Sequence, residues 1–446
     1  MDQTVSLNDK NNIEINDDFL RAIEAINSGK NGLFITGKPG TGKSTFLDFF
    51  RTTTKKKAVV LAPTGVAAVN IQGQTIHSFF NFKPDITVDT VPSVKFDPSK
   101  AKLYKRLELV IIDEISMVRS DLMDCIDAFL RLHGPDREKS FGGVQMVYIG
   151  DLYQLEPVVP PNERHIFQTL YRSPYFFDSQ AVQKTGVETI EFRKNYRQNE
   201  QAFLKLLDAI RTGQTRREDI DTLNTRYQPG FIPPEDQFYM HLTTTNKLAD
   251  QINRERLDAL KEDLFTYEGR RAGDFSVKNL PTHESLDLKI GAHVMLLNND
   301  PEGRWVNGSV GRIEDIFSAG FNSVAVLVKL ADGVQVEVEP FKWEIFEFYY
   351  NEKKDGIDSR IVGSFKQFPI KLAWAITIHK SQGKTFNRVI IDIGNGAFCH
   401  GQIYVALSRC TAFGGIVLKQ KIAPGDIRVN SHVTMFDIRD IRTDAD

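Results

Sequence analysis

The residues with the clearest chemical meaning form a glycine-rich segment, GKPGTGKS at positions 37–44. An apolar run, Leu33 to Ile35, precedes it, and a helical pattern follows it. In such a strand–loop–helix segment, backbone N–H groups can turn toward a phosphate, which the positive end of the helix also faces. Lys43 can reach the β- and γ-phosphates of a nucleotide, and the Ser44 hydroxyl can bind Mg²⁺. A chance glycine-rich turn is the alternative, and the complete motif with both flanking elements argues against it.

Two carboxylates, Asp113 and Glu114, follow the apolar run Leu109 to Ile112. A phosphate-loop ATPase needs carboxylates at this place, because Asp113 can hold Mg²⁺ through water or Ser44 and Glu114 can polarise the attacking water. An apolar run that ends in Asp-Glu is weak evidence alone. Its position downstream of a phosphate loop makes it much stronger.

Two more segments have polar side chains where a phosphate could bind. Residues 150–155 (GDLYQL) follow the apolar strand 146–149, at the ligand edge of a parallel sheet, so Gln154 can sense the γ-phosphate or the water. An ordinary Asx-type loop is the alternative. Residues 193–198 (RKNYRQ) are a basic turn after the strand 189–192, and they could offer an arginine to a phosphate across a domain cleft.

Two segments have the composition of nucleic-acid contacts. Residues 63–68 (PTGVAA) form a turn of small residues that opens a helix and could bind phosphate at its N-terminus. Residues 73–80 (GQTIHSFF) mix hydrogen-bonding and aromatic side chains, as a base-stacking surface does. The pair Phe79-Phe80 alone is more typical of a hydrophobic core.

Composition sets the broad class of the protein. A chain of 446 residues is expected to form about two to four domains. Its net charge of −2 is no global nucleic-acid signature, but a translocating channel needs only a local basic and aromatic lining. No apolar run approaches the ~18–20 residues of a membrane span, and the polar N-terminus has no signal-peptide core. The cysteines (Cys125, Cys399, Cys410) are widely spaced, which fits a reducing cytoplasm and gives no zinc pattern.

The order of patterns predicts an α/β fold of two tandem units, each a parallel sheet flanked by helices. Strand and helix patterns alternate over 1–185, and a second set starts near 186. Residues 286–365 have short strand patterns and the tight-turn pairs Asn307-Gly308 and Asp332-Gly333, which predict a small inserted β-barrel or sandwich. The α/β pattern resumes over 366–446. The stretch 82–100, which is interrupted by prolines, predicts a small irregular insertion outside the core. As part of the first domain, this insertion is expected to cover about residues 76–100.

The motifs occur in the order GKPGTGKS, LAPTGVAA, GQTIHSFF, IIDEISM, GDLYQLEPV, NYRQ, TIHKSQGKT and YVALSR. This set resembles superfamily-one helicases, specifically the RecD-like branch and the Pif (petite integration frequency) DNA helicases. The run FGGVQMVYIGDLYQLEPV looks like the hallmark region of that family, and GAHVMLLNND…RWVNGSVGRI looks like its inserted Src-homology-three-like barrel. The resemblance covers about residues 15–420 and is far more specific than the phosphate loop alone.

The resemblance implies two RecA-like domains, 1–185 and 186–285 with 366–446, a barrel at 286–365 and a wedge insertion. It implies ATP and Mg²⁺ in the cleft between the domains, single-stranded DNA crossing both, and 5′→3′ translocation. Arg197 and Arg409 match arginines that reach the γ-phosphate from the second domain, and Gln154 and Gln382 match residues that couple nucleotide to the domains. The implied catalytic residues are Lys43, Asp113, Glu114, Gln154, Arg197 and Arg409. The implied nucleotide-binding residues are Gly37, Pro39, Gly40, Thr41, Gly42, Lys43, Ser44, Thr45, Gln382 and Gly383, with Ser44 and Asp113 on the metal.

The resemblance also implies DNA contacts and partners. The residues in DNA-contact motifs are Pro63, Thr64, Gly65, Val66, His77, Ser78, Phe79, Thr245, Asn246, His379, Lys380 and Ser381. The expected partners are single-stranded DNA and DNA forks, with G-quadruplex DNA as a further candidate and no membrane. The enzyme is expected to be monomeric, cytoplasmic and of bacterial or phage type. One departure concerns adenine: the family often has a glutamine near the position of Phe19, and Asp17 to Leu20 contain none. Adenine selectivity is then looser or comes from backbone groups.

Three function classes remain open. A DNA helicase fits best, and an RNA helicase or a translocase without strand separation comes next, because contacts to the RNA 2′-hydroxyl leave no sequence pattern. A non-enzymatic DNA-binding or scaffold protein fits least, since every catalytic residue type is present.

Overall fold

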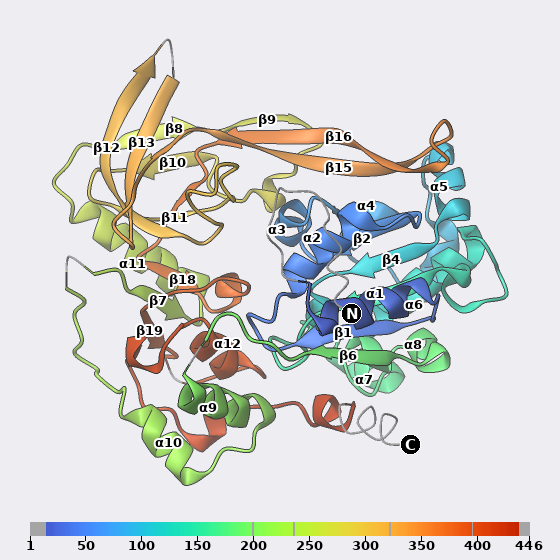
Figure 1. The fold of residues 1–446 in the computed structure, drawn as a ribbon, viewed down its shortest axis with the longest axis horizontal. Coiled ribbons are helices and arrows are strands. Elements are labelled where there is room, and N and C mark those ends of the chain that lie inside the picture. Colours follow the sequence, from blue (N-terminus) through green and yellow to red (C-terminus); the bar gives the residue numbers. More distant parts are fainter. Residues whose placement is uncertain (1–14, 199, 235–236, 321–322, 395, 437–446) are drawn as a thin grey trace, which may run out of the picture.

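Six parallel strands form the sheet that carries the phosphate loop, in the order β3-β2-β4-β5-β1-β6. The computed structural model describes residues 15–198, 200–234, 237–320, 323–394 and 396–436. This first unit lies on the right of Figure 1. Its elements are α1 (Asp17–Asn27), β1 (Leu33–Gly37), α2 (Lys43–Thr53), β2 (Ala58–Ala62), α3 (Gly65–Asn70), β3 (Gln74–Thr75), α4 (Ile76–Phe80), α5 (Ala101–Arg106), β4 (Leu109–Ile112), α6 (Ser120–His133), β5 (Gln145–Ile149), α7 (Arg164–Leu170), α8 (Gln180–Thr185) and β6 (Glu188–Phe192).

Strand β1 explains why both faces of this sheet are covered. All five of its residues are buried, as expected of a central strand in a parallel sheet. Leu33 and Ile35 point into one hydrophobic core with Phe46 of α2, whereas Phe34 points into the opposite core with Phe129 of α6. The phosphate loop therefore starts from a strand that is fixed from both sides.

The second unit is a four-stranded parallel sheet in the order β18-β7-β19-β20, at the lower left of Figure 1. Its elements are α9 (Gln201–Thr212), α10 (Arg217–Asn224), β7 (Met240–Thr243), α11 (Asn246–Asp258), β18 (Ala375–Thr377), β19 (Val389–Asp392), α12 (Gln402–Ser408) and β20 (Ile416–Leu418). The α/β class with parallel sheets is as the sequence predicts. The outer ends of the expected domains, residues 1–14 and 437–446, lie outside the described residues.

Strand β6 corrects the boundary expected at residue 186. It pairs in parallel with β1, from Leu33 opposite Glu188 to Gly37 opposite Phe192, so it completes the first sheet. The first unit therefore extends to Phe192. A five-residue strand has the same pattern in either sheet, and only its pairing shows where it belongs.

The inserted β structure is larger than the expected 286–365. We call residues 265–372 the β insert. Its strands are β8 (Phe265–Glu268), β9 (Arg270–Gly273), β10 (Ser285–Leu288), β11 (His293–Leu296), β12 (Val310–Gly320), β13 (Ser323–Leu330), β14 (Gln335–Val338), β15 (Phe341–Asn351), β16 (Gly356–Gln367) and β17 (Ile370–Leu372). Strands β14-β13-β12-β11-β17 form an antiparallel five-stranded sheet over a core of its own. The correction arises because β8, β9 and β17 lie outside the interval in sequence but pair within it.

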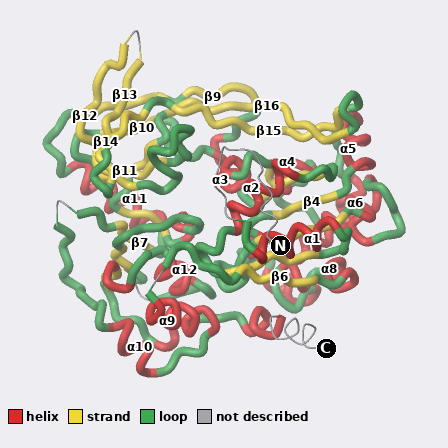
Figure 2. Tube along the Cα trace, viewed as in Figure 1, coloured by secondary structure: helices red, strands yellow, loops and turns green. Residues whose placement is uncertain are grey.

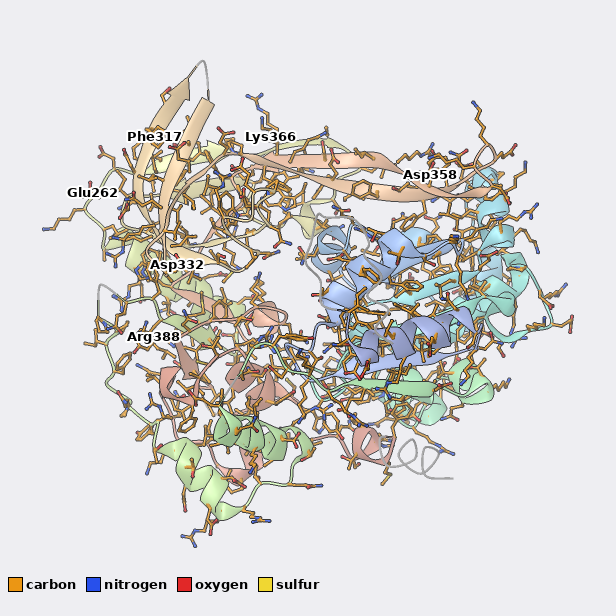
Figure 3. The ribbon with its side chains drawn as sticks, in the orientation of Figure 1. Glu262, Phe317, Asp332, Asp358, Lys366 and Arg388 are labelled. Carbon is orange, nitrogen blue, oxygen red and sulfur yellow. The ribbon has the colours of Figure 1, made fainter. Side chains whose placement is uncertain are left out.

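Strands β15 and β16 form a long hairpin that crosses the top of the molecule to α5 of the first unit (Figures 1 and 2). In Figure 3, Lys366 lies toward the base of this hairpin and Asp358 near its tip. The backbone N–H of Phe348 donates to Gln74 Oε1 over 3.0 Å, and Lys100 pairs with Glu347 over 2.7 Å. The β insert is thus attached to the first unit through its hairpin as well as to the second unit through the chain.

The stretch 82–100 has the irregular structure that its prolines predict, with two 3₁₀ turns, Val88–Ser93 and Pro98–Lys100. Its expected separation from the core is wrong, however. Phe82 and Val91 are buried in the core of the first unit, because the segment packs against α6. Among the described residues, no helix has the length and apolar character needed to cross a membrane.

Candidate nucleotide site and DNA-binding surfaces

The phosphate loop connects β1 to α2, and its own backbone holds the side chain of Lys43. Lys43 Nζ donates to the carbonyl oxygens of Gly37 at 2.6 Å and Lys38 at 3.1 Å. Gly42 stands at the N-cap of α2 with φ of 87°, a left-handed conformation that favours glycine. Ser44 and Thr45 are exposed on the first turn of α2, whereas Thr41 is buried and donates to Lys38 O. The predicted cradle is therefore assembled at a helix N-terminus.

The carboxylates Asp113 and Glu114 follow β4 at the same edge of the sheet. Burial raises the pKa of Asp113 to about 7, and the neighbouring Glu114 adds to the shift. Burial also raises the pKa of Glu114, whereas the positive charges of Lys43 and Arg409 lower it. Glu114 has φ of 50°, and a non-glycine residue in this region stores about 1–3 kcal/mol of strain, as residues at active sites often do. Lys43 and Arg409 thus both act electrostatically on Glu114.

The segment that leaves β6 covers the phosphate loop. Tyr196 N donates to Gly40 O over 2.8 Å, and Asn195 Nδ2 donates to Pro39 O over 3.1 Å. A Cβ added to Gly40 would lie 2.5 Å from the Cβ of Arg197, so this glycine permits the close approach. Arg197 in turn reaches the second unit, where its guanidinium donates to Gly383 O over 3.4 Å.

Arg409 lies at the C-terminal end of α12 and is 1 % exposed. It donates to Val405 O over 3.0 Å and to Ser408 Oγ over 2.7 Å, so the side chain is fixed in place. Burial lowers its pKa to about 9, and the charge of Arg197 contributes. Burial lowers the pKa of Arg197 as well, to about 10. Two desolvated guanidinium groups close enough for their charges to interact are well suited to bind a polyphosphate.

Gln154 and Gln382 meet across the boundary between the two units. The Nε2 of Gln382 donates to Oε1 of Gln154 over 3.3 Å. Gln154 follows β5 in the first unit, and Gln382 follows the 3₁₀ turn His379–Ser381 in the second. The structure therefore brings together the two residues that match the coupling residues of the resembled family.

Ser44 and Asp113 fit Mg²⁺ only together with a nucleotide. Both offer hard oxygen ligands, which Mg²⁺ prefers. In the described part of the chain, no group of three or more His, Cys, Asp or Glu side chains could hold a metal ion unaided. The remaining ligands would then be water and phosphate oxygens, as is usual for Mg²⁺ at phosphoryl-transfer sites.

The predicted DNA contacts lie on both units, at the starts of similar helices. Thr64 caps α3 by accepting from Ala67 N, and Thr245 caps α11 by accepting from Leu248 N. Val66, Ser78, Thr245, Asn246 and Lys380 are exposed, and Pro63, Thr64, Gly65, His77 and His379 are partly exposed. These ten residues are accessible to a strand, and their contact with DNA stays a prediction.

Two side chains predicted to contact DNA are internal, which corrects the assignment. Phe79 is 1 % exposed, and its ring packs edge-on against Phe80 and Tyr104, with centroids 4.8 and 5.5 Å away. Ser381 is 0 % exposed, and its hydroxyl donates to Ile378 O over 2.6 Å. The motif pattern predicts which segments approach DNA, but it does not indicate which side chains of a segment face inward.

Sequence reasoning missed the contacts of the β insert with both units. Asn307 Nδ2 donates to Asn70 Oδ1 of the first unit over 3.2 Å, and Lys384 Nζ of the second unit donates to Asn307 Oδ1 over 2.7 Å. A Cβ added to Gly65 would lie 2.4 Å from Asn279, so the β insert also touches the start of α3. The pair Asn307-Gly308 indicated a turn, and no sequence signal indicated its partners.

A basic cluster beside His379 was also missed. Burial lowers the pKa of Lys371 to about 8, and the positive charges of Lys380 and Lys384 contribute to the shift. Burial lowers the pKa of Lys384 to about 8 as well. Lysines held close enough to disfavour one another's charge are expected to bind an anion such as a DNA phosphate.

Comparisons with known proteins agree with this geometry. The PIF1-like helicase family matches residues 12–221. The ATP-dependent DNA helicase Pif1 of Bdellovibrio bacteriovorus is 31 % identical over 417 residues, which cover 91 % of this chain and 88 % of the relative. The crystal structure of Pif1 from Bacteroides sp. in complex with ADP-AlF4 has a TM-score of 0.87 at 34 % identity, covering 96 % of this chain and 97 % of the other. Bacteroides Pif1 bound to single-stranded DNA has the same identity and coverage with a TM-score of 0.67. The chain belongs to the PIF1-like helicase family.

Proposed function

We propose that this protein is an ATP-dependent DNA helicase that translocates 5′→3′ on single-stranded DNA and unwinds duplex or structured DNA. The observation that carries the proposal is the shared nucleotide site. Arg197 packs on Gly40 of the phosphate loop, and Arg409 of the second unit acts electrostatically on Glu114 of the first. A nucleotide bound there would hold the two units together. The DNA substrate and the direction come from family membership.

In this mechanism the chain's own residues bind and orient the triphosphate. Lys43, Arg197 and Arg409 converge on the phosphates, and an arginine supplied at such a site can contribute roughly 10³–10⁵ in rate. Glu114 polarises the attacking water. Ser44 and Asp113 would hold Mg²⁺, which would supply positive charge beside the phosphate oxygens. Loss of the γ-phosphate removes the anion that joins the units, so they part.

Closing and opening of the two units move the protein along DNA if the two units bind the strand in alternation. The surfaces at α3 and α4 belong to one unit, and those at α11 and the turn His379–Ser381 belong to the other. We expect contacts to phosphates and base faces, which tolerate any sequence and weaken with salt. The β insert and the stretch 82–100 would flank the fork. We further propose that the protein is monomeric when free, works in the cytoplasm on the nucleoid, and accepts G-quadruplex DNA.

A strand-displacement assay tests this function. Substrates with a 5′ tail, a 3′ tail or an RNA duplex are incubated with and without ATP, beside a Lys43→Ala variant as the inactive control. We expect ATP-dependent displacement of the 5′-tailed DNA only. Displacement from the 3′ tail would contradict the direction, and displacement of RNA would favour an RNA helicase. Hydrolysis without displacement would identify a translocase.

A further inference from the structure

Asp151, which follows β5, is fully buried, and each of its carboxylate oxygens has two donors. Oδ1 accepts from Arg211 Nη2 over 3.3 Å and from the backbone N–H of Tyr153 over 3.2 Å. Oδ2 accepts from Tyr404 Oη over 3.2 Å and from Gln154 Nε2 over 3.4 Å. The local donors, Tyr153 and Gln154, are those of the ordinary loop turn, whereas the other two are distant in sequence.

The distant donors both belong to the second unit. Arg211 lies in the last turn of α9, and Tyr404 lies in α12. The guanidinium of Arg211 also stacks over the Tyr153 ring, 4.1 Å from its centroid. We call Asp151, Arg211 and Tyr404 the Asp151 clamp. It joins the two units through one carboxylate.

The clamp is connected to the catalytic arginine through α12. Tyr404 and Arg409 lie on the same short helix, where Arg409 is the C-cap. The N-cap, Gly401, is pressed against the first unit, since a Cβ there would lie 2.4 Å from Gln154 O and 2.5 Å from Tyr153 O. Helix α12 has only about two turns and is held at Gly401 and at Tyr404. Its C-terminal end, where Arg409 lies, therefore has little freedom to move. The clamp therefore sets where Arg409 lies relative to Glu114.

The clamp also lies beside the phosphate loop. Arg211 and Tyr404 line a small cavity together with Lys38 and Pro39 of that loop. A buried carboxylate is tolerated only while it is paired, because an unpaired buried charge is strongly unfavourable. When the units part, Asp151 loses both distant donors, so the clamp favours the arrangement in which the nucleotide site is complete.

We propose that Arg211 is a positioning residue for ATP hydrolysis, which with Tyr404 clamps Asp151 across the boundary between the units and so fixes Arg409 at the nucleotide. This role differs from those of Arg197 and Arg409, which the proposed mechanism places at the phosphates. The inference rests on the proposed ATPase function. It adds a residue that no helicase motif in the sequence indicated.

Steady-state ATP hydrolysis with saturating single-stranded DNA tests the clamp in the full-length chain. For Arg211→Met we expect kcat to fall about tenfold while the KM for ATP changes by less than about threefold, because orientation is lost and ground-state binding is kept. Asp151→Asn should lose a similar factor. The double variant should be no slower than the slower single variant, since residues that act as one unit are not additive.

The matched control is Asp208→Asn. Asp208 is on the same helix as Arg211 and pairs with Lys38 of the phosphate loop over 2.8 Å, but both side chains are partly exposed. An exposed ion pair contributes little, so kcat should stay within about twofold of wild type. A role confined to stability would lower the melting temperature of Arg211→Met and leave kcat unchanged.

These measurements decide whether the Asp151 clamp positions Arg409. A wild-type kcat in Arg211→Met, or losses that multiply in the double variant, would overturn it. If Arg211→Met does not fold, Tyr404→Phe removes only one hydroxyl, and a kcat within about twofold of wild type would overturn the clamp just as clearly. Absence of ATP hydrolysis in the wild-type protein would instead overturn the proposed function.

Discussion

The side chains of Gln154 and Gln382 are hydrogen-bonded to each other although 228 residues separate them in the chain. Each follows an element at the nucleotide edge of its own unit, β5 for Gln154 and the turn His379–Ser381 for Gln382. The turn also carries Lys380, an exposed residue of the predicted DNA surface. The glutamine pair therefore connects the candidate nucleotide site to the predicted DNA surface.

Gln382→Met should uncouple these two sites. The substitution keeps side-chain length but removes the amide, so we expect ATP hydrolysis without DNA to stay within about threefold of wild type while stimulation by single-stranded DNA falls about tenfold. Hydrolysis rates measured across a DNA titration give both values. Gln420→Met is the control, because Gln420 bonds to Asp392 within the second unit. Full stimulation in Gln382→Met would remove the glutamine pair from the coupling path.

Glu114→Gln should abolish turnover while binding persists. The amide cannot accept a proton from the attacking water, and a positioned general base is worth about 10²–10⁴ in rate. Hydrolysis, nucleotide affinity and DNA affinity are measured on the same preparation. An unchanged rate would exclude Glu114 as the activating base.

Arg409→Ala should lose DNA-stimulated hydrolysis by roughly 10³-fold or more if the arginine stabilises the transition state. The phosphate loop lies on the other unit, so nucleotide affinity should fall far less. Because Arg409 is buried, Arg197→Ala serves as a parallel variant with a more accessible side chain. Wild-type rates in both variants would show that neither arginine acts across the boundary.

Lys371→Gln should weaken DNA binding and reduce its salt dependence. One phosphate contact on a single strand contributes about −0.7 to the slope of log K against log salt concentration, so the slope should become shallower by about that amount. Lys366→Gln is the control, since Lys366 is an exposed residue of β16 on the hairpin. Equal slopes for wild type and Lys371→Gln would exclude the contact.

The same lysine gives a pH prediction. The pKa of Lys371 is lowered to about 8, so its charged fraction falls as the pH rises from 7 to 9. DNA affinity of the wild type should therefore decrease over this range, and the decrease should be smaller for Lys371→Arg, which stays charged. Fluorescence anisotropy at constant ionic strength measures both. An identical pH dependence of the two proteins would show that another group titrates.

The sequence predicted which side chains gather at the candidate nucleotide site because each part follows a strand or opens a helix. Lys43, Asp113 and Gln154 lie in the segments that follow three buried strands of one parallel sheet, whose ends meet at one edge. The predictions that the structure corrected concern features that depend on long-range strand pairing or on the direction of a side chain. The place of β6 in the first sheet, the limits of the β insert and the burial of Phe79 all follow from contacts that no local pattern encodes. The Asp151 clamp was missed for the same reason, since Arg211 and Tyr404 lie 60 and 253 residues away.

The hairpin β15–β16 completes a closed ring of contacts among the two units and the β insert. Contacts run from the first unit to the hairpin, through the β insert to the second unit, and back to the first through Gln154 and Gln382. A strand lying along α3 and the turn His379–Ser381 would pass Asn307 inside this circuit. Circular DNA, which has no end to thread, could enter only where a contact opens. The pair Lys102–Glu352 at the hairpin tip is largely solvent-exposed, and such a pair contributes only about 0–1 kcal/mol, whereas Lys57 of the pair Lys57–Asp355 is only 15 % exposed. Opening the tip alone would leave Lys100–Glu347 and the Phe348–Gln74 hydrogen bond in place, so a closed circle of DNA could enter at the hairpin only after these contacts also break.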